Sequence, residues 1–147
     1  MRTYGSPSRR LHWLLAAVLA AGCATPPQQD PSLYARLGGE PVVRRVVTET
    51  IDRAATDPRT SRSFKDVKLQ RVKDMIVEQI CNLGGGGCKY SGDPMDKVHK
   101  GLKNTEAEMN LVVQWLREAC DHAGVRTAEK NELLLLLAPM KRDIVTQ

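Results

Sequence analysis

The sequence predicts an all-α fold in a single domain. Apolar residues recur at helical spacing in several windows, as in the run Val42, Val43, Val46, Val47 and Ile51. No stretch of four or more residues alternates convincingly between apolar and polar, so no strand is predicted. The length of 147 residues suits one domain. Together these features favour about five or six helices around one core.

The predicted helices follow from their start and stop signals. One begins at Glu40-Pro41 after the turn at Gly38-Gly39 and ends at Asp57-Pro58. A second helix is expected from Leu69 to the glycine run at 84, and a third from Asp93 to Leu102. A fourth should run from the capping box of Thr105 and Glu108 to Gly124. The last should start after Thr127, with a kink at Pro139. Phe64, the only phenylalanine, falls in an irregular stretch between the first two.

Residues 1–22 are typical of a signal peptide. Three arginines precede an apolar run, Leu11 to Ala21, that is shorter than the roughly 20 residues needed to span a membrane. The sequence 19-LAAGC-23 resembles a bacterial lipobox, which predicts lipidation of Cys23; a plain signal peptide with a chance cysteine is the alternative. Residues 23–31 then form a flexible Pro-rich tether, and residues 32–147 the globular domain.

This organisation predicts a lipid-anchored protein on the extracytoplasmic side of the cell envelope, at the outer membrane if the host has two. Residues 1–22 hold three arginines and no acid, so their removal lowers the formal charge from +5 to +2. The small excess and the compartment both argue against nucleic-acid binding. A solvated face is the simplest interpretation of the basic residues Arg59, Arg62, Lys65, Lys68, Arg71 and Lys73.

His99 is the first candidate functional residue. Met95, Val98, His99 and Leu102 lie at helical spacing on one apolar face, which predicts that His99 points inward. A core histidine bonded to a carbonyl and a ligating histidine are both compatible with this pattern. Tetrahedral zinc needs more ligands than this face offers. A haem supplies four iron ligands itself, so one axial histidine in an apolar slot suffices.

Cys81 and Cys88 flank the four glycines at 84–87, and the two cysteines could close a small disulfide ring or remain thiols. Cys120 lies on an apolar helix face and is expected to be a buried small hydrophobe. A helix precedes the glycines and no Gly-Lys-Ser/Thr follows, which argues against a phosphate loop. We expect the loop to give slack between two helices, so that the His99 segment can swing across a bound group.

Four motifs in order carry a family resemblance: 33-LYARLGG-39, 79-QICNLGGGGCKYSG-92, 94-PMDKVHKGL-102 and 132-ELLLLLAPMKRDIV-145. The chain resembles a group I truncated haemoglobin over about Leu33 to Val145. The resemblance implies a shortened globin, helices packed two-on-two around haem b (iron protoporphyrin). It implies that His99 is the proximal iron ligand and that Phe64 packs on the haem face.

The resemblance also places the distal side of the haem. It implies that Val72 and Ile76 lie on the helix above the iron and that Ile51 stands where the family usually carries tyrosine. Tyr90 and Lys100 are expected near the propionates. Where the family often has Tyr and Gln donors, this chain has Ile51 and Ile76. Each good donor to bound O₂ is worth roughly 1–3 kcal/mol in a buried site, so O₂ binding should weaken more than CO binding.

Gln79 and Thr50 are the candidates to replace one of these donors. The resulting prediction is a haem b globin of the cell envelope that binds diatomic gases (O₂, NO, CO) at iron held by His99, with an apolar distal pocket. NO detoxification and exchange with an electron-donor protein are compatible activities, and the lipid anchor would attach the protein to a membrane. The alternative is a haem-free helical envelope lipoprotein that acts as a binding or scaffold module.

Overall fold

The computed structural model describes Met1 and residues 30–146. The expected signal peptide, Cys23 and most of the expected tether lie outside these residues. The helices are α1 (Leu33–Arg36), α2 (Gly39–Thr56), η1 (Ser61–Phe64), α3 (Leu69–Leu83), α4 (Met95–Val98), α5 (Glu106–His122), α6 (Thr127–Leu137), η2 (Ala138–Met140) and α7 (Lys141–Ile144).

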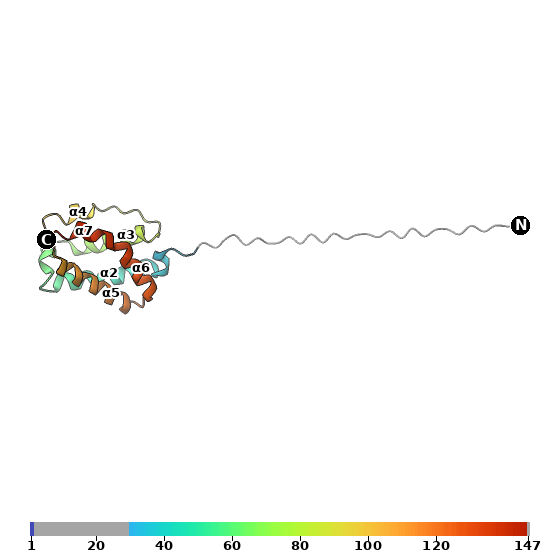
Figure 1. Ribbon diagram of the computed structural model, residues 1–147, viewed down its shortest axis with the longest axis horizontal. Helices are drawn as coiled ribbons and strands as arrows, with labels where there is room; N and C mark the ends of the chain where they lie inside the picture. The colour runs from blue at the N-terminus through green and yellow to red at the C-terminus, as the bar shows by residue number, and fades with distance from the viewer. Residues whose placement is uncertain (2–29, 147) are drawn as a thin grey trace.

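The long helices form a two-layered helical sandwich. Helix α2 packs against both α3 and α5, and α6 packs against α1 and α5. Figure 1 shows α4 apart from the long helices, on extended connections along one edge of the domain, where its neighbour is α7. Residues 30–146 contain no strand, only a single bridge between Asn104 and Val145. The predicted all-α fold is therefore confirmed.

The core lies where α2 meets α3 and α5. It contains Leu33, Leu37, Val43, Val46, Val47, Ile51, Val77, Ile80, Ala119, Cys120 and Leu133. Full burial of one such large aliphatic side chain stabilises the fold by roughly 1.5–3 kcal/mol. Cys120 is 1% exposed, as predicted for a small hydrophobe. Burial raises the pKa of its thiol to about 11, so it stays protonated and unreactive.

Most predicted helix boundaries are confirmed. Thr105 and Glu108 form the capping box of α5, and Asp57 ends α2. Pro139 interrupts the last helix, which continues as η2 and then α7. Helix α2 begins one residue earlier than predicted, at Gly39, because Gly38 adopts a left-handed φ of 101° as its N-cap. None of the described helices is both long and apolar enough to cross a membrane.

Two predictions about the short helices are wrong. The described residues contain seven α-helices and two 3₁₀ helices, not five or six, because a four-residue helix such as α1 carries too few residues for a periodic pattern and Pro139 divides the last helix. The helix predicted from Asp93 to Leu102 is only Met95–Val98, with Pro94 as its N-cap. Val98 is 45% exposed, so it does not belong to the buried face as predicted.

Candidate functional site

His99 lies at the C-terminal end of α4 and is half-buried. Its Nδ1 atom lies 2.9 Å from the carbonyl oxygen of Met95, one helical turn earlier. Because a carbonyl can only accept a hydrogen bond, Nδ1 must carry the proton in the neutral ring. The lone pair is then on Nε2. This is how a histidine is oriented when its second nitrogen ligates a metal, and Nε2 could serve as a single axial ligand.

The four apolar residues assigned to a haem pocket belong to one region. Ile51 on α2 is 5% exposed and is part of the core. Phe64 at the end of η1, with Val72 and Ile76 on α3, is half-buried and packs against that core. We call these four residues the apolar cluster. Half-buried apolar side chains on a packed base are the chemistry that a flat, apolar cofactor face requires.

The two candidate polar donors differ. Thr50 is buried, and its hydroxyl donates to the carbonyl of Val46 at 2.8 Å. Its only proton is therefore engaged within its own helix and is not directed at a ligand. Gln79 is half-buried on α3, and its amide makes no hydrogen bond with any residue in the described part of the chain. Gln79 thus keeps its donor protons available, whereas Thr50 does not.

Tyr90 is engaged within its own loop. Its hydroxyl donates to the carbonyl of Asp93 at 3.1 Å. Burial raises the pKa of Tyr90, and the nearby carboxylates of Asp93 and Glu78 raise it further. A side chain at Gly92 would collide with this ring, since its Cβ would lie 2.2 Å from the Tyr90 hydroxyl oxygen. Lys100 is exposed and follows His99 directly.

The loop before α4 is fastened to α3, in contrast to the expected slack. A disulfide joins Cys81 on α3 to Cys88, with their Cα atoms 5.6 Å apart. The side-chain amide of Asn82 donates to the Cys88 carbonyl at 2.8 Å. Further along, Ser91 donates to Glu78 Oε2 through its backbone N–H at 2.9 Å and its hydroxyl at 2.8 Å. We call these contacts the upstream anchor.

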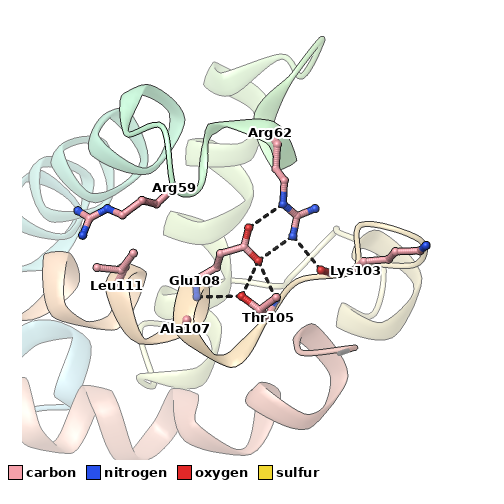
Figure 2. A pocket seen from close by; sticks show the side chains of 7 residues that line it. All are labelled: Arg59, Arg62, Lys103, Thr105, Ala107, Glu108 and Leu111. Atoms are coloured by element: carbon pink, nitrogen blue, oxygen red, sulfur yellow. Dashed lines mark hydrogen bonds and ion pairs between the residues drawn. The ribbon is translucent and has the colours of Figure 1, made fainter.

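The chain after His99 is fastened to η1 and α5 by Arg62. Its guanidinium donates to the carbonyls of Leu102 at 2.6 Å and Lys103 at 2.8 Å. The same group binds both carboxylate oxygens of Glu108 at 2.7 Å, as Figure 2 shows. These contacts, which we call the downstream anchor, border a surface cavity of about 570 Å³. The Arg62 hydrogen bond pulls the pKa of Glu108 down to about 2, against the effect of burial.

A second set of hydrogen bonds supports the downstream anchor. Ser63 donates to the side-chain oxygen of Asn104, which is 9% exposed. The carbonyl of Asn104 accepts from the N–H of Thr146 at 3.0 Å. The end of the chain is thereby joined to the residues that follow the His99 segment.

Sequence reasoning missed both anchors except for the cysteine pair. Arg62 is not part of a solvated face, because Glu108 and two carbonyls bind it. Lys73 is a second exception: its side chain is 13% exposed and pairs with Asp52 at 2.6 Å. No local pattern signals these contacts, because they join residues 40 to 46 positions apart for Arg62 and about 20 for Lys73. Only the capping-box motif marks Glu108 as a structural residue.

The fold and the site define a globin: helices packed around an apolar cluster, with one histidine at the end of the short helix α4, which follows α3. Comparison with known proteins identifies the family. Residues 32–146 match the family model of the bacterial-like globins. The chain belongs to this family, and its relatives place it among the group I truncated haemoglobins.

The relatives cover nearly the whole domain. The group 1 truncated haemoglobin GlbN of Mycolicibacterium paratuberculosis is 33% identical over 118 residues, which is 80% of this chain and 87% of that protein. The Nostoc sp. protein of the same name is 28% identical over 79% of this chain and 98% of its own length. The family model covers residues 32–146, so the family assignment concerns the described domain.

Solved structures show the same fold. The Fe(III) form of the truncated haemoglobin from Tetrahymena pyriformis superposes with a TM-score of 0.74 at 22% identity, covering 80% of this chain and all of that one. The 2/2 haemoglobin from Synechococcus, solved in the cyanomet state with covalently attached haem, gives a TM-score of 0.72 at 19% identity and the same coverage. The predicted truncated globin fold is confirmed.

Proposed function

We propose that this chain is a haem b globin of the cell envelope that binds diatomic gases, with His99 Nε2 as the axial ligand. The observation that carries the proposal is the hydrogen bond from His99 Nδ1 to the Met95 carbonyl, which leaves Nε2 as the ligating atom. Family membership supports a haem protein. Bound haem would supply an iron with one coordination position open for a gas molecule.

The apolar cluster fits the face of such a group. Phe64, Val72 and Ile76 would exclude water and contact the porphyrin, and their half-buried side chains have apolar surface left to contribute. In the described residues, no group of three or more His, Cys, Asp or Glu side chains gathers to hold a metal ion alone. His99 as sole protein ligand suits a porphyrin, which brings the remaining in-plane ligands with it.

The distal side favours gases that need no hydrogen bond. Ile51 and Ile76 offer no donor, and the Thr50 proton is directed at Val46. A ligand that carries partial negative charge gains most from a donor, which applies to O₂ more than to CO or NO. We therefore propose that NO and CO bind with ordinary affinity and that O₂ binds weakly. Gln79 is the one side chain positioned on α3 with an unused amide.

The test is an absorption spectrum of the full chain, purified in detergent and supplied with haem, in the ferric state, the ferrous state and with CO. We expect a Soret band that shifts sharply on CO addition. His99→Ala should abolish or strongly alter it, and His122→Ala, at an exposed histidine on α5, should leave it unchanged. If no Soret band forms, or if it survives His99→Ala unchanged, the chain is better described by the haem-free alternative.

We also propose attachment to the envelope through a lipid on Cys23, on the extracytoplasmic side and at the outer membrane if the host has two. The lipobox supports this, and so does the Cys81–Cys88 disulfide, since disulfides persist in oxidising compartments. Cys23→Ser should move the protein from the membrane fraction to the soluble fraction. A variant that remains in the membrane fraction would argue against lipidation of Cys23.

A further inference from the structure

The segment that carries His99 is held mainly at its two ends. We call residues 92–103 the proximal strap. Most of its side chains, including Asp96, Lys97, Val98 and Lys100, are exposed. Little apolar burial is therefore available to hold α4 in place, and the two anchors must supply most of the fixation.

The upstream anchor is tightly built around the disulfide. The backbone N–H of Gly86 donates to the Cys81 carbonyl at 2.8 Å. A Cβ at Gly86 would lie 2.7 Å from Cys81 Sγ and 2.5 Å from the Tyr34 ring, so only glycine fits there. The backbone N–H of Tyr34 donates to Gly84 at 2.9 Å. The ring of residues 81–88 therefore contacts α1 through Tyr34 and is continuous with the end of α3.

The anchor is also close to His99 along the chain. Only Gly92 and Asp93 separate Ser91, bound by Glu78, from Pro94, the N-cap of α4. The Tyr90 hydrogen bond to Asp93 spans even these two residues. A displacement of the anchored loop must therefore pass directly to α4 and to the Met95 carbonyl that orients His99.

We propose that Cys81, Cys88 and Glu78 are positioning residues for His99, and that reduction of the Cys81–Cys88 disulfide loosens the proximal strap and weakens haem retention. This rests on the proposed function of His99 as the axial ligand. The device would make haem binding respond to the thiol redox state of the compartment. It needs no change in the apolar cluster.

The redox step requires a dithiol reductant, for example a reduced protein dithiol of the envelope. One thiolate attacks Cys88 Sγ, the exposed side of the bond, and Cys81 leaves as a thiolate that takes up a proton. The second thiol of the reductant then displaces Cys88. Two electrons and two protons pass to the cysteine pair, and the reductant becomes a disulfide.

The first readout is hydrogen exchange of the haem-free full chain in detergent, oxidised and after treatment with dithiothreitol. We expect amide exchange in residues 84–101 to rise on reduction by a factor on the order of ten to a hundred, with α2 and α5 unchanged. Equal exchange in both states would overturn the proposed control of the strap. Because haem is absent, this result does not depend on the proposed function.

The second readout uses the haem-loaded chain. Reduction should speed haem transfer to excess apomyoglobin by about tenfold and broaden the iron–histidine stretching band in the ferrous resonance Raman spectrum. A disulfide with a merely structural role would leave that band unchanged. If the chain binds haem but neither quantity changes, the inference fails while the proposed function stands. If no haem binds, the proposed function fails and hydrogen exchange still decides the strap.

Matched variants separate this thiol pair from the rest of the chain. The double variant Cys81→Ser/Cys88→Ser should behave like the reduced protein and stop responding to dithiothreitol. Cys120→Ala, which removes the buried free thiol, should keep the full response. Should the double variant fail to fold, Glu78→Ala tests the same anchor: it removes the acceptor of both Ser91 hydrogen bonds and should raise strap exchange several-fold while the disulfide stays intact. Amide exchange of the strap that is unchanged in Glu78→Ala would contradict the role of Glu78.

Discussion

The apolar cluster and the proximal strap face the same proposed cofactor but are built by different chemistry. Ile51, Val72 and Ile76 lie on helices of 18 and 15 residues whose inner faces are buried together. His99 lies at the end of a four-residue helix whose neighbours are mostly exposed. One side is fixed by close packing, and the other by a disulfide, a carboxylate and an arginine.

Because they are built differently, the apolar cluster and the proximal strap can control different properties of the protein. Packed side chains on long helices change little with conditions, so under the proposed function the apolar cluster would set which gas is favoured. Polar and covalent anchors respond to pH and to thiol reductants, so the strap can set how firmly the cofactor is held. A mutation on one side should therefore leave the other side's property unchanged, and four pairs of variants test this division.

The largest effect is expected from a donor restored to the apolar cluster. Ile76→Gln places an amide where Ile76 is half-buried on α3. If haem binds as proposed, the O₂ dissociation constant should fall by a factor on the order of ten to a hundred, and the CO constant should change much less. Flash photolysis and stopped-flow dissociation measure both. Ile76→Leu is the control of similar volume, and an equal gain for O₂ and CO would contradict a hydrogen-bond origin.

The next effect concerns the downstream anchor. Arg62→Ala removes the donor to Leu102 and Lys103 and leaves Glu108, whose side chain is 14% exposed, without its partner. We expect the free energy of unfolding to fall by about 2 kcal/mol, because charge-assisted hydrogen bonds to half-buried groups are lost. Urea denaturation measures it. Arg117→Ala, at an exposed arginine of α5, should cost less than about 0.5 kcal/mol.

The same contrast explains what the sequence could predict. Helices α2, α3 and α5 follow from 3.6-residue periodicity and from caps such as Thr105, which are local signals. His99 could be proposed as the proximal histidine because the family motif that contains it is local too. Arg62 and Glu78 could not, since an arginine that binds a carbonyl 40 residues away is indistinguishable in sequence from a solvated one. Val98 was misplaced because apolar spacing predicts a buried face only where a helix is long enough to pack one.

A smaller effect is expected from acid. Arg62 holds the pKa of Glu108 at about 2, below its ordinary value of 4.5, so the ionised carboxylate stabilises the fold above pH 4.5 and this contribution is lost as the pH falls toward 2. Since Arg62 is about half exposed, solvent screening limits the loss to about 1 kcal/mol. Glu108→Gln keeps a capping side chain but lacks the charge. The unfolding free energies of the variant and the native chain should therefore converge between pH 4.5 and 2.

The convergence of the two unfolding free energies supports the downstream anchor only if it is specific to Glu108. Glu106→Gln is the matched control. Glu106 lies in the same helical turn as Glu108, but it is exposed and pairs with Lys141. Its difference from the native chain should vary less with pH. A difference for Glu108→Gln that stays constant from pH 5 to 2 would show that Arg62 does not bind the carboxylate in solution.

The smallest effect compares one substitution in the two regions. Gly101 in the strap (φ 81°) and Gly124 after α5 (φ 77°) share a left-handed backbone, and a Cβ at either would meet no atom within 4 Å. Alanine should therefore cost about 1 kcal/mol at each position through backbone strain alone. In Gly124→Ala the cost should appear in global unfolding, with exchange of the strap unchanged. In Gly101→Ala it should appear as a roughly fivefold rise in amide exchange over residues 93–101, because the strap can open while the long helices stay packed. If exchange of the strap rises equally in both variants, the strap and the core open as one unit, and a disulfide at one end could not act on His99 alone.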